Sequence, residues 1–131
     1  MTEQKHTCPL CERLKAGDVI VQTELAAAIK DAYPVSPGHT LIVPKRHEPS
    51  YFALSAKEAT ALLELLELAK LILESERQPD GYNIGINEGV AAGQTVFHVH
   101  LHLIPRYEGD VPDPRGGIRW IKPERAKYWK R

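Results

Sequence analysis

Several features of specialised proteins are missing from this chain of 131 residues. It has two cysteines, too few for a disulfide framework, and no run of apolar residues long enough to span a membrane. The first ten residues lack the apolar core of a signal peptide. The 17 Lys and Arg residues balance the 17 Asp and Glu residues, so net charge gives no reason to expect a nucleic-acid or membrane partner. We therefore predict a cytoplasmic protein that binds neither.

The length, together with the absence of internal repeats and of a separating linker, predicts a single domain spanning 1–131. One long helix is expected at 55–77, because Ser55 and Glu58 form a capping box ahead of an apolar stripe with helical spacing. Strands are expected at 19–21, 25–29, 39–43, 82–87 and 96–104, with loops at 33–38 and 88–94. No regular element is expected at 1–17 or from residue 106 onward.

Three histidines at alternate positions are the most informative feature. On an extended strand His98, His100 and His102 share one face, while the apolar residues between them face the core. The α-carbons of His98 and His102 would be about 13 Å apart on a straight strand, so one metal ion cannot bind all three. Two neighbours could share an ion. At least one imidazole must therefore serve as a nucleophile, a general acid or a hydrogen-bond donor to an anion.

The loop before these histidines favours an anionic ligand. Gly89 and Gly93 allow backbone N–H groups to approach a ligand closely, and Gln94 and Thr95 add an amide and a hydroxyl. Imidazole is largely neutral near pH 7 and attacks phosphorus well. The loop and the histidines together favour phosphoryl or nucleotidyl transfer.

The segment 98–104 resembles the signature of the histidine triad (HIT) family, His-φ-His-φ-His-φ-φ with φ apolar, at every position. The similarity extends through 38–47, 87–89 and 92–96 and covers about residues 8–108, which leaves 109–131 as a tail. The resemblance implies an α+β fold in which an antiparallel sheet of about five strands packs with one long helix. It also implies that two subunits pair as a homodimer and extend the sheet.

The same resemblance implies a nucleotide hydrolase that cleaves dinucleoside polyphosphates or nucleoside phosphoramidates at the α-phosphate, through a nucleotidyl-histidine intermediate. His100 would be the nucleophile, His102 would contact the phosphate, and His39 would support the triad. Because the third motif histidine is retained, hydrolysis is favoured over transfer to a sugar phosphate. Mg²⁺ would accompany a polyphosphate substrate. The other expected nucleotide-binding residues are Asp31 at the ribose, Gln94 or Thr95 at the α-phosphate, and Asn87 and Gly93 on the phosphate side.

Cys8 and Cys11 form a C-x-x-C pair that is a redox pair, half of a zinc site, or two buried free thiols. A thioredoxin-like pair needs a βαβ context, and this pair precedes the first predicted strand. Zinc needs two further ligands. Resemblance to bacterial HIT proteins with this pair favours His47 and His98, with His6 as the competing ligand. The ion would be structural and would join the N-terminus to the sheet.

The sequence is also compatible with two other functions: a nucleotide-binding or scaffold protein with little turnover, and a metal-dependent hydrolase that uses His98 and His100 as ligands.

The tail allows two interpretations. Residues 106–131 hold 8 basic and 4 acidic residues, against 9 and 13 in residues 1–105. Residues 116–129 are similar to the tail of bacterial members described as diadenosine tetraphosphate hydrolases. The tail is either a solvated surface or a source of cations near a polyphosphate leaving group, with candidates Arg106, Arg115, Arg119 and Lys122.

Overall fold

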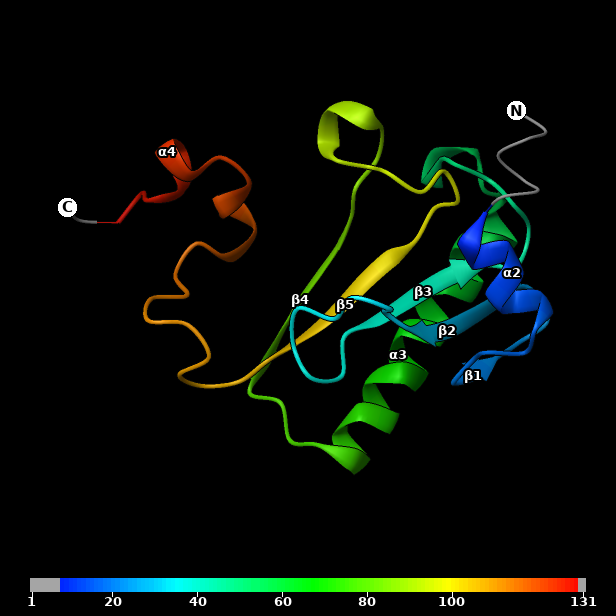
Figure 1. Ribbon diagram of the computed structural model, residues 1–131, viewed down its shortest axis with the longest axis horizontal. Coiled ribbons are helices and arrows are strands. Elements are labelled where there is room, and N and C mark those ends of the chain that lie inside the picture. The colour runs from blue at the N-terminus through cyan, green and yellow to red at the C-terminus, as the bar shows by residue number, and fades with distance from the viewer. Residues whose placement is uncertain (1–7, 130–131) are drawn as a thin grey trace.

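The computed structural model describes residues 8–129 and contains a five-stranded antiparallel sheet (Figure 1). Its strands are β1 (Val21–Gln22), β2 (Ala26–Lys30), β3 (Thr40–Pro44), β4 (Gly81–Ile86) and β5 (Leu101–Arg106). Their order across the sheet is β1-β2-β3-β5-β4, so the last strand in the chain lies between β3 and β4. The predicted class, an antiparallel sheet of about five strands with one long helix, is confirmed.

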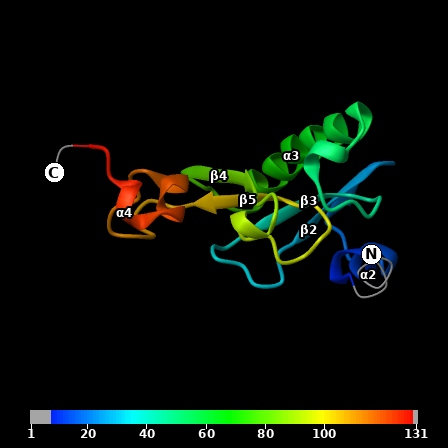
Figure 2. The same cartoon turned by 90° about the horizontal axis from the view of Figure 1, so that it is seen from above.

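The long helix α3 (Ala56–Glu76) covers one face of the sheet (Figure 2). Its predicted capping box is present, because the Ser55 hydroxyl accepts the Glu58 N–H at 3.1 Å and the Glu58 carboxylate accepts the Ser55 N–H at 2.8 Å. Within 8–129, no helix has the length and apolar character needed to cross a membrane. The core between helix and sheet contains Ala26, Ala28, Ile42, Ala61, Leu62, Leu65, Ala69, Leu73, Leu101 and Leu103.

A smaller core lies on the opposite face, beneath the short helix α2 (Pro9–Lys15) (Figure 2). Sequence periodicity does not reveal this helix, because seven residues are too few to show it. Its first turn is capped by a thiol: Cys8 Sγ accepts the N–H of Cys11 at 3.3 Å. Side chains that alternate with those under α3 complete this core, which contains Cys8, Leu10, Ala27, Ile29, Leu41 and Val43.

The predicted strand at 96–104 is wrong in its first half, because β5 begins only at Leu101. Val99 donates its N–H to the carbonyl of Glu48 at 2.7 Å, so this part of the chain follows the loop after β3 instead of a neighbouring strand. The apolar alternation still holds, because Val99, Leu101 and Leu103 are all buried. The ends of the other strands differ from their predicted positions by one or two residues.

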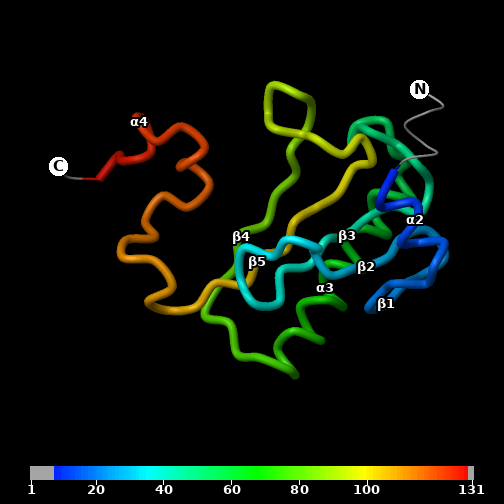
Figure 3. Tube along the Cα trace, in the orientation of Figure 1, coloured from blue at the N-terminus to red at the C-terminus, as the bar shows by residue number. Residues whose placement is uncertain are grey.

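The C-terminal segment is folded and lies at the opposite end of the molecule from α2 (Figure 3). It contains the 3₁₀ helix η3 (Gly117–Ile121) and the short helix α4 (Pro123–Ala126), so the expectation of no regular element there is wrong. The guanidinium of Arg115 lies 4.6 Å from the ring centroid of Trp129. The Trp120 indole N–H donates to the Arg115 carbonyl at 2.8 Å. We refer to residues 115–129 as the C-terminal unit.

Candidate active site and metal site

Pairing of β3 with β5 brings His39 and His102 together. Leu41 of β3 lies opposite His102 in the register, and His39 immediately precedes β3 on the same face. His39 Nε2 lies 2.9 Å from His102 Nδ1 and 3.2 Å from the Asp31 carboxylate. Three residues that the sequence assigns to one nucleotide site therefore form a single cluster.

A backbone contact fixes where the protons lie in this cluster. The Val35 N–H donates to His39 Nδ1 at 3.1 Å, so the neutral ring carries its proton on Nε2 and shares it with Asp31 and His102 Nδ1. His102 must then carry its own proton on Nε2. Burial lowers the pKa of His102 to about 4, and the neighbouring His100 contributes to the lowering. Burial also lowers the pKa of His39, against the opposing effect of Asp31. Near pH 7 the rings of His39 and His102 are therefore both neutral, and the Nε2–H of His102 is available as a hydrogen-bond donor.

The ring of His100 carries its proton on the other nitrogen from that of His102. Its Nδ1 lies 2.9 Å from the carbonyl oxygen of His98, and because a carbonyl only accepts, Nδ1 is the donor. The lone pair of the neutral ring is then on Nε2. The ring centroids of His100 and His102 are 5.2 Å apart. Adjacent rings therefore offer a nucleophilic lone pair and a hydrogen-bond donor, which is what attack on a phosphate group needs.

Gln94 holds the glycine-rich loop in place with its side-chain amide. Its Oε1 accepts the N–H of Gly89 at 2.8 Å, and its Nε2 donates to the carbonyls of Pro49 and Val96 at 2.9 and 3.1 Å. The side chain is buried, whereas the adjacent Thr95 is exposed. Of the two residues predicted at the α-phosphate, Gln94 thus has its amide bound to the backbone, and Thr95 is accessible.

An open pocket of about 730 Å³ joins two of the histidines to the glycine-rich loop, and His100 does not line it. His39 and His102 line it together with Asn87 and Gly93, so four of the predicted site residues share one cavity. Gly93 has a φ of 97°, a conformation that side chains rarely adopt, and it ends the 3₁₀ turn η2 (Val90–Ala92). The pocket continues as far as the C-terminal unit, which the sequence singled out for its charge and for its similarity to the tails of bacterial HIT proteins.

Cys8, Cys11, His47 and His98 form a second cluster, in which one ligand atom of each residue lies within 4.8 Å of all the others. His98 Nδ1 is 3.5 Å from both sulfur atoms, and His47 Nδ1 is 3.3 Å from Cys11 Sγ. A tetrahedral zinc ion with ordinary bond lengths separates its sulfur and nitrogen ligands by about 3.6 Å. The four residues therefore fit zinc. The competing ligand, His6, lies outside the described residues.

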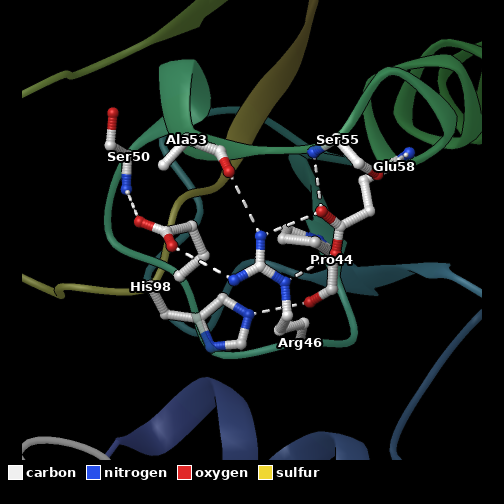
Figure 4. A network of polar contacts seen from close by, with 8 residues as sticks. Pro44, Arg46, Ser50, Ala53, Ser55, Glu58 and His98 are labelled. Atoms are coloured by element: carbon white, nitrogen blue, oxygen red, sulfur yellow. Dashed lines mark hydrogen bonds and ion pairs between the residues drawn. The ribbon is translucent and has the colours of Figure 1, made fainter.

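The orientation of the His98 ring also fits a metal ligand. Its Nε2 donates to the Pro44 carbonyl at 2.8 Å (Figure 4). This leaves the Nδ1 lone pair directed at the two cysteines. The ring is fully buried, and this burial lowers the pKa of His98 while the Pro44 carbonyl opposes the shift. A buried neutral imidazole with its free nitrogen facing two thiols is a suitable zinc ligand.

Arg46 connects α3 to the loop that carries His47. Its guanidinium donates to the Glu58 carboxylate at 2.9 and 3.0 Å, to Glu48 at 3.2 Å and to the Ala53 carbonyl at 3.2 Å (Figure 4). Because Arg46 is its strongest partner, the pKa of Glu58 lies well below its usual range. Sequence reasoning recognised Glu58 as a helix cap, but no local pattern signals its second partner from another element.

Residues 13–109, which make up most of the chain, match the HIT domain family. This chain belongs to the HIT domain family. It is similar to an uncharacterized HIT-like protein from Mycoplasma genitalium, at 44% identity over 78% of this chain and 74% of that protein. A bis(5'-nucleosyl)-tetraphosphatase (asymmetrical) from Schizosaccharomyces pombe is 40% identical over 74% of this chain and 53% of its own length. An adenylylsulfatase from Arabidopsis thaliana is 30% identical over 81% of this chain and 55% of its own length. This HIT chain thus spans about half the length of the last two proteins.

Solved structures confirm the HIT fold predicted from the sequence. A HIT family protein from Bacillus anthracis superposes with a TM-score of 0.73 at 36% identity, covering 79% of this chain and 75% of its own. A zinc-bound histidine triad family protein from Mycobacterium smegmatis superposes with a TM-score of 0.72 at 34% identity, covering 83% and 86%. Zinc binding is thus compatible with this fold in a protein of similar length.

Proposed function

We propose that this HIT protein hydrolyses dinucleoside polyphosphates at the α-phosphate through a nucleotidyl group carried by His100. The observation that carries the proposal is the hydrogen bond from His100 Nδ1 to the His98 carbonyl. It directs the lone pair to Nε2, next to the N–H donor of His102. The tetraphosphatase among the relatives supports the substrate class.

The reaction takes two displacements at phosphorus. In the first, Nε2 of His100 attacks the α-phosphorus; a P–N bond forms while the bridging P–O bond breaks, and the leaving nucleotide takes the electron pair. The Nδ1 proton stays on the ring, where the His98 carbonyl stabilises the positive charge of the adduct. In the second, water attacks the same phosphorus and the electrons of the P–N bond return to Nε2. The products are a nucleoside monophosphate, the shortened nucleotide and one proton.

The other predicted site residues would bind the nucleotide around this reaction. His102 would donate its Nε2 proton to a phosphate oxygen, and the exposed Thr95 would contact the same phosphate. Asp31 would accept from a ribose hydroxyl; its two oxygens already accept the Tyr33 N–H at 2.7 Å and face His39 at 3.2 Å. The phosphate side of the pocket would be lined by Asn87 and Gly93.

We further propose a structural zinc ion bound by Cys8, Cys11, His47 and His98. When bound, the ion would supply a cross-link between α2, the loop after β3 and the segment before β5. The reaction would take no step through it. Mg²⁺ is expected to arrive with the polyphosphate and not on a protein site.

The homodimer is proposed from the position of β4. This strand is the last in the sheet order, so among the described strands its outer edge has no neighbour and can pair with a second copy. The cytoplasmic location is proposed with it, because the proposed zinc site needs both cysteines in the reduced state, which reducing compartments preserve.

The two other functions are less well supported. A catalytic ion shared by His98 and His100 conflicts with the ring orientations, because His98 Nδ1 faces the cysteines while His100 Nδ1 is bound to a carbonyl. A scaffold with little turnover would not need the lone pair of His100 to be oriented.

Mass spectrometry of the protein mixed briefly with diadenosine tetraphosphate tests the mechanism. We expect one AMP adduct on the peptide that contains His100, and isotopically labelled water should label the AMP released. His100→Ala should lose both the adduct and the turnover while still binding AMP. Substantial turnover by His100→Ala would contradict the mechanism. AMP binding without any turnover by the wild type would instead favour the scaffold.

A further inference from the structure

We infer that Arg46 is a positioning residue for the proposed nucleophile: together with Glu48 it fixes the peptide group whose carbonyl orients the ring of His100. This inference rests on the proposed function, because it concerns the step in which that ring attacks phosphorus. Arg46 lies on the loop after β3 and does not line the pocket of the histidines, so it would act through other residues.

A single peptide group joins the nucleophile to the loop after β3. Its carbonyl, from His98, accepts from His100 Nδ1 at 2.9 Å. Its N–H, from Val99, donates to the Glu48 carbonyl at 2.7 Å. Because a peptide group is planar and trans, its N–H and C=O point in opposite directions, and a partner that fixes one also fixes the other. The Glu48 carbonyl thereby sets the direction in which the His98 carbonyl meets the imidazole.

The two hydrogen bonds of this peptide group also strengthen each other. Hydrogen bonds in series polarise the groups between them, so a peptide whose N–H is bound has a carbonyl that accepts more strongly. The group lies between two buried residues, His98 and Val99. A buried N–H that loses its acceptor is costly, so the folded protein needs the Glu48 carbonyl at this position.

The loop after β3 takes the place of a neighbouring strand for the chain before β5. Val99 precedes β5 and pairs with neither of the strands beside it. The Pro44 carbonyl instead accepts from the ring of His98 at 2.8 Å. The Pro49 carbonyl accepts from the amide of Gln94 at 2.9 Å. The chain before β5 therefore lies where this loop places it.

Side chains hold the loop in turn, and Arg46 is central among them. It donates to one oxygen of the Glu48 carboxylate at 3.2 Å, and the other oxygen accepts the Ser50 N–H at 3.1 Å. The same guanidinium donates to the Ala53 carbonyl at 3.2 Å and to both oxygens of Glu58 at 2.9 and 3.0 Å (Figure 4). Arg46 thus connects the residue that binds the peptide group to the first turn of α3.

The shape of the guanidinium matters more here than its charge. Glu58 caps a helix of 21 residues and its side chain is buried, so it is a firm anchor. The side chain of Arg46 is half exposed, and solvent weakens its electrostatic attraction to the acids. A planar guanidinium can bind Glu58, Glu48 and Ala53 at once, whereas the ammonium of a lysine is a point charge and cannot.

Three substitutions separate positioning from charge and from stability. Arg46→Ala should lower the kcat for diadenosine tetraphosphate about tenfold, because a displaced nucleophile attacks more slowly. The Kd for AMP should stay within about threefold, since the pairing of β2 with β3 positions Asp31 and His39. Arg46→Lys should lose about threefold in kcat, although the charge is kept. Ser55→Ala is the matched control: it removes the hydroxyl that caps α3 and should lower the melting temperature by about 5 °C, yet keep kcat within about twofold.

Nitrogen NMR of the His100 ring gives a readout that needs no substrate. Above the ordinary titration range of imidazole, Nδ1 of His100 should be protonated in the wild type and Nε2 should not. Arg46→Ala should mix the two tautomers. Glu48→Gln should do the same and lower kcat about threefold, because it keeps an oxygen for the Ser50 N–H but loses the charge that Arg46 binds. Saturating zinc in every sample separates this effect from any change at the adjacent His47.

Wild-type kcat in Arg46→Ala, full activity of Arg46→Lys, or an equal loss of kcat in Ser55→Ala would overturn the inference. An unchanged His100 tautomer in both Arg46→Ala and Glu48→Gln would overturn it as well. If the wild type cleaves no dinucleotide, the proposed function fails, and the tautomer alone decides whether Arg46 positions the ring. If Arg46→Ala does not fold, Arg46→Lys and Glu48→Gln give the same comparison.

Discussion

The carbonyl oxygen of His98 lies 2.9 Å from His100 Nδ1, while the His98 ring points to the sulfur atoms of Cys8 and Cys11. One residue therefore orients the proposed nucleophile with its backbone and completes the proposed zinc site with its side chain. Histidines that alternate along a sequence need not act at one site, and here His98 and His102 belong to different clusters.

The zinc site can be separated from the reaction by a double substitution. Cys8→Ser/Cys11→Ser should remove a bound zinc ion, because both sulfur ligands are lost, and lower the melting temperature by at least about 5 °C. The kcat for diadenosine tetraphosphate should stay within about tenfold of the wild type below the new melting temperature. Metal analysis and calorimetry give the two readouts, and a chelator added to the wild type is the control. Full zinc occupancy in the variant would show that other residues bind the ion.

Acidification should destabilise the fold through His102. Its pKa is about 4 in the folded protein, so between about pH 6.5 and 4 the unfolded state binds the proton more readily and is favoured as pH falls. The loss is at most about 3 kcal/mol of unfolding free energy and is absent above pH 7. Asp31, His39 and His100 face this ring. Denaturant unfolding across this range should show a flatter profile for His102→Gln, and identical profiles would contradict the assignment.

Gly38 should not tolerate a side chain. It has a φ of 93°, and a Cβ there would lie 2.8 Å from Leu73 Cδ2 and 3.2 Å from Pro105 Cγ. Gly38→Ala should therefore cost about 2 to 3 kcal/mol of unfolding free energy. Gly81→Ala is the matched control on β4, because its φ is ordinary and a Cβ there meets nothing within 4 Å. Equal stability of the two variants would show that the loop after β2 relaxes around the added methyl group.

Gln94 and Thr95 should differ in how they affect activity. Gln94→Ala leaves an N–H and two carbonyls without their partner, so we expect about 2 kcal/mol lower stability together with a lower kcat. Thr95→Ala should leave stability within about 0.5 kcal/mol and raise the KM, because Thr95 is exposed and contacts only the ligand in our proposal. Denaturant unfolding and steady-state kinetics of both variants distinguish the roles. The reverse pattern would place Gln94 at the phosphate.

Local patterns predicted the elements that local contacts define. The capping box located α3 to within one residue at each end, because Ser55 and Glu58 bond to each other. The start of β5 depends on a carbonyl from the loop after β3, and the fold of the C-terminal unit on ring contacts of Arg115 and Trp129. The metal ligands were proposed from family resemblance, since no spacing rule relates residues 8 and 98. The distances that bring them together arise only in the folded sheet.

The separation of 90 positions in sequence from Cys8 to His98 has a consequence for synthesis of the chain. On the ribosome, β1, β2 and β3 emerge and can pair long before His98 is made, whereas β3 must wait for β5. During that interval the second edge of β3 is open to pairing with other chains. The proposed zinc site likewise lacks its fourth ligand until His98 has been made. The supply of the metal should therefore influence only the last stage of folding, after β1, β2 and β3 have paired.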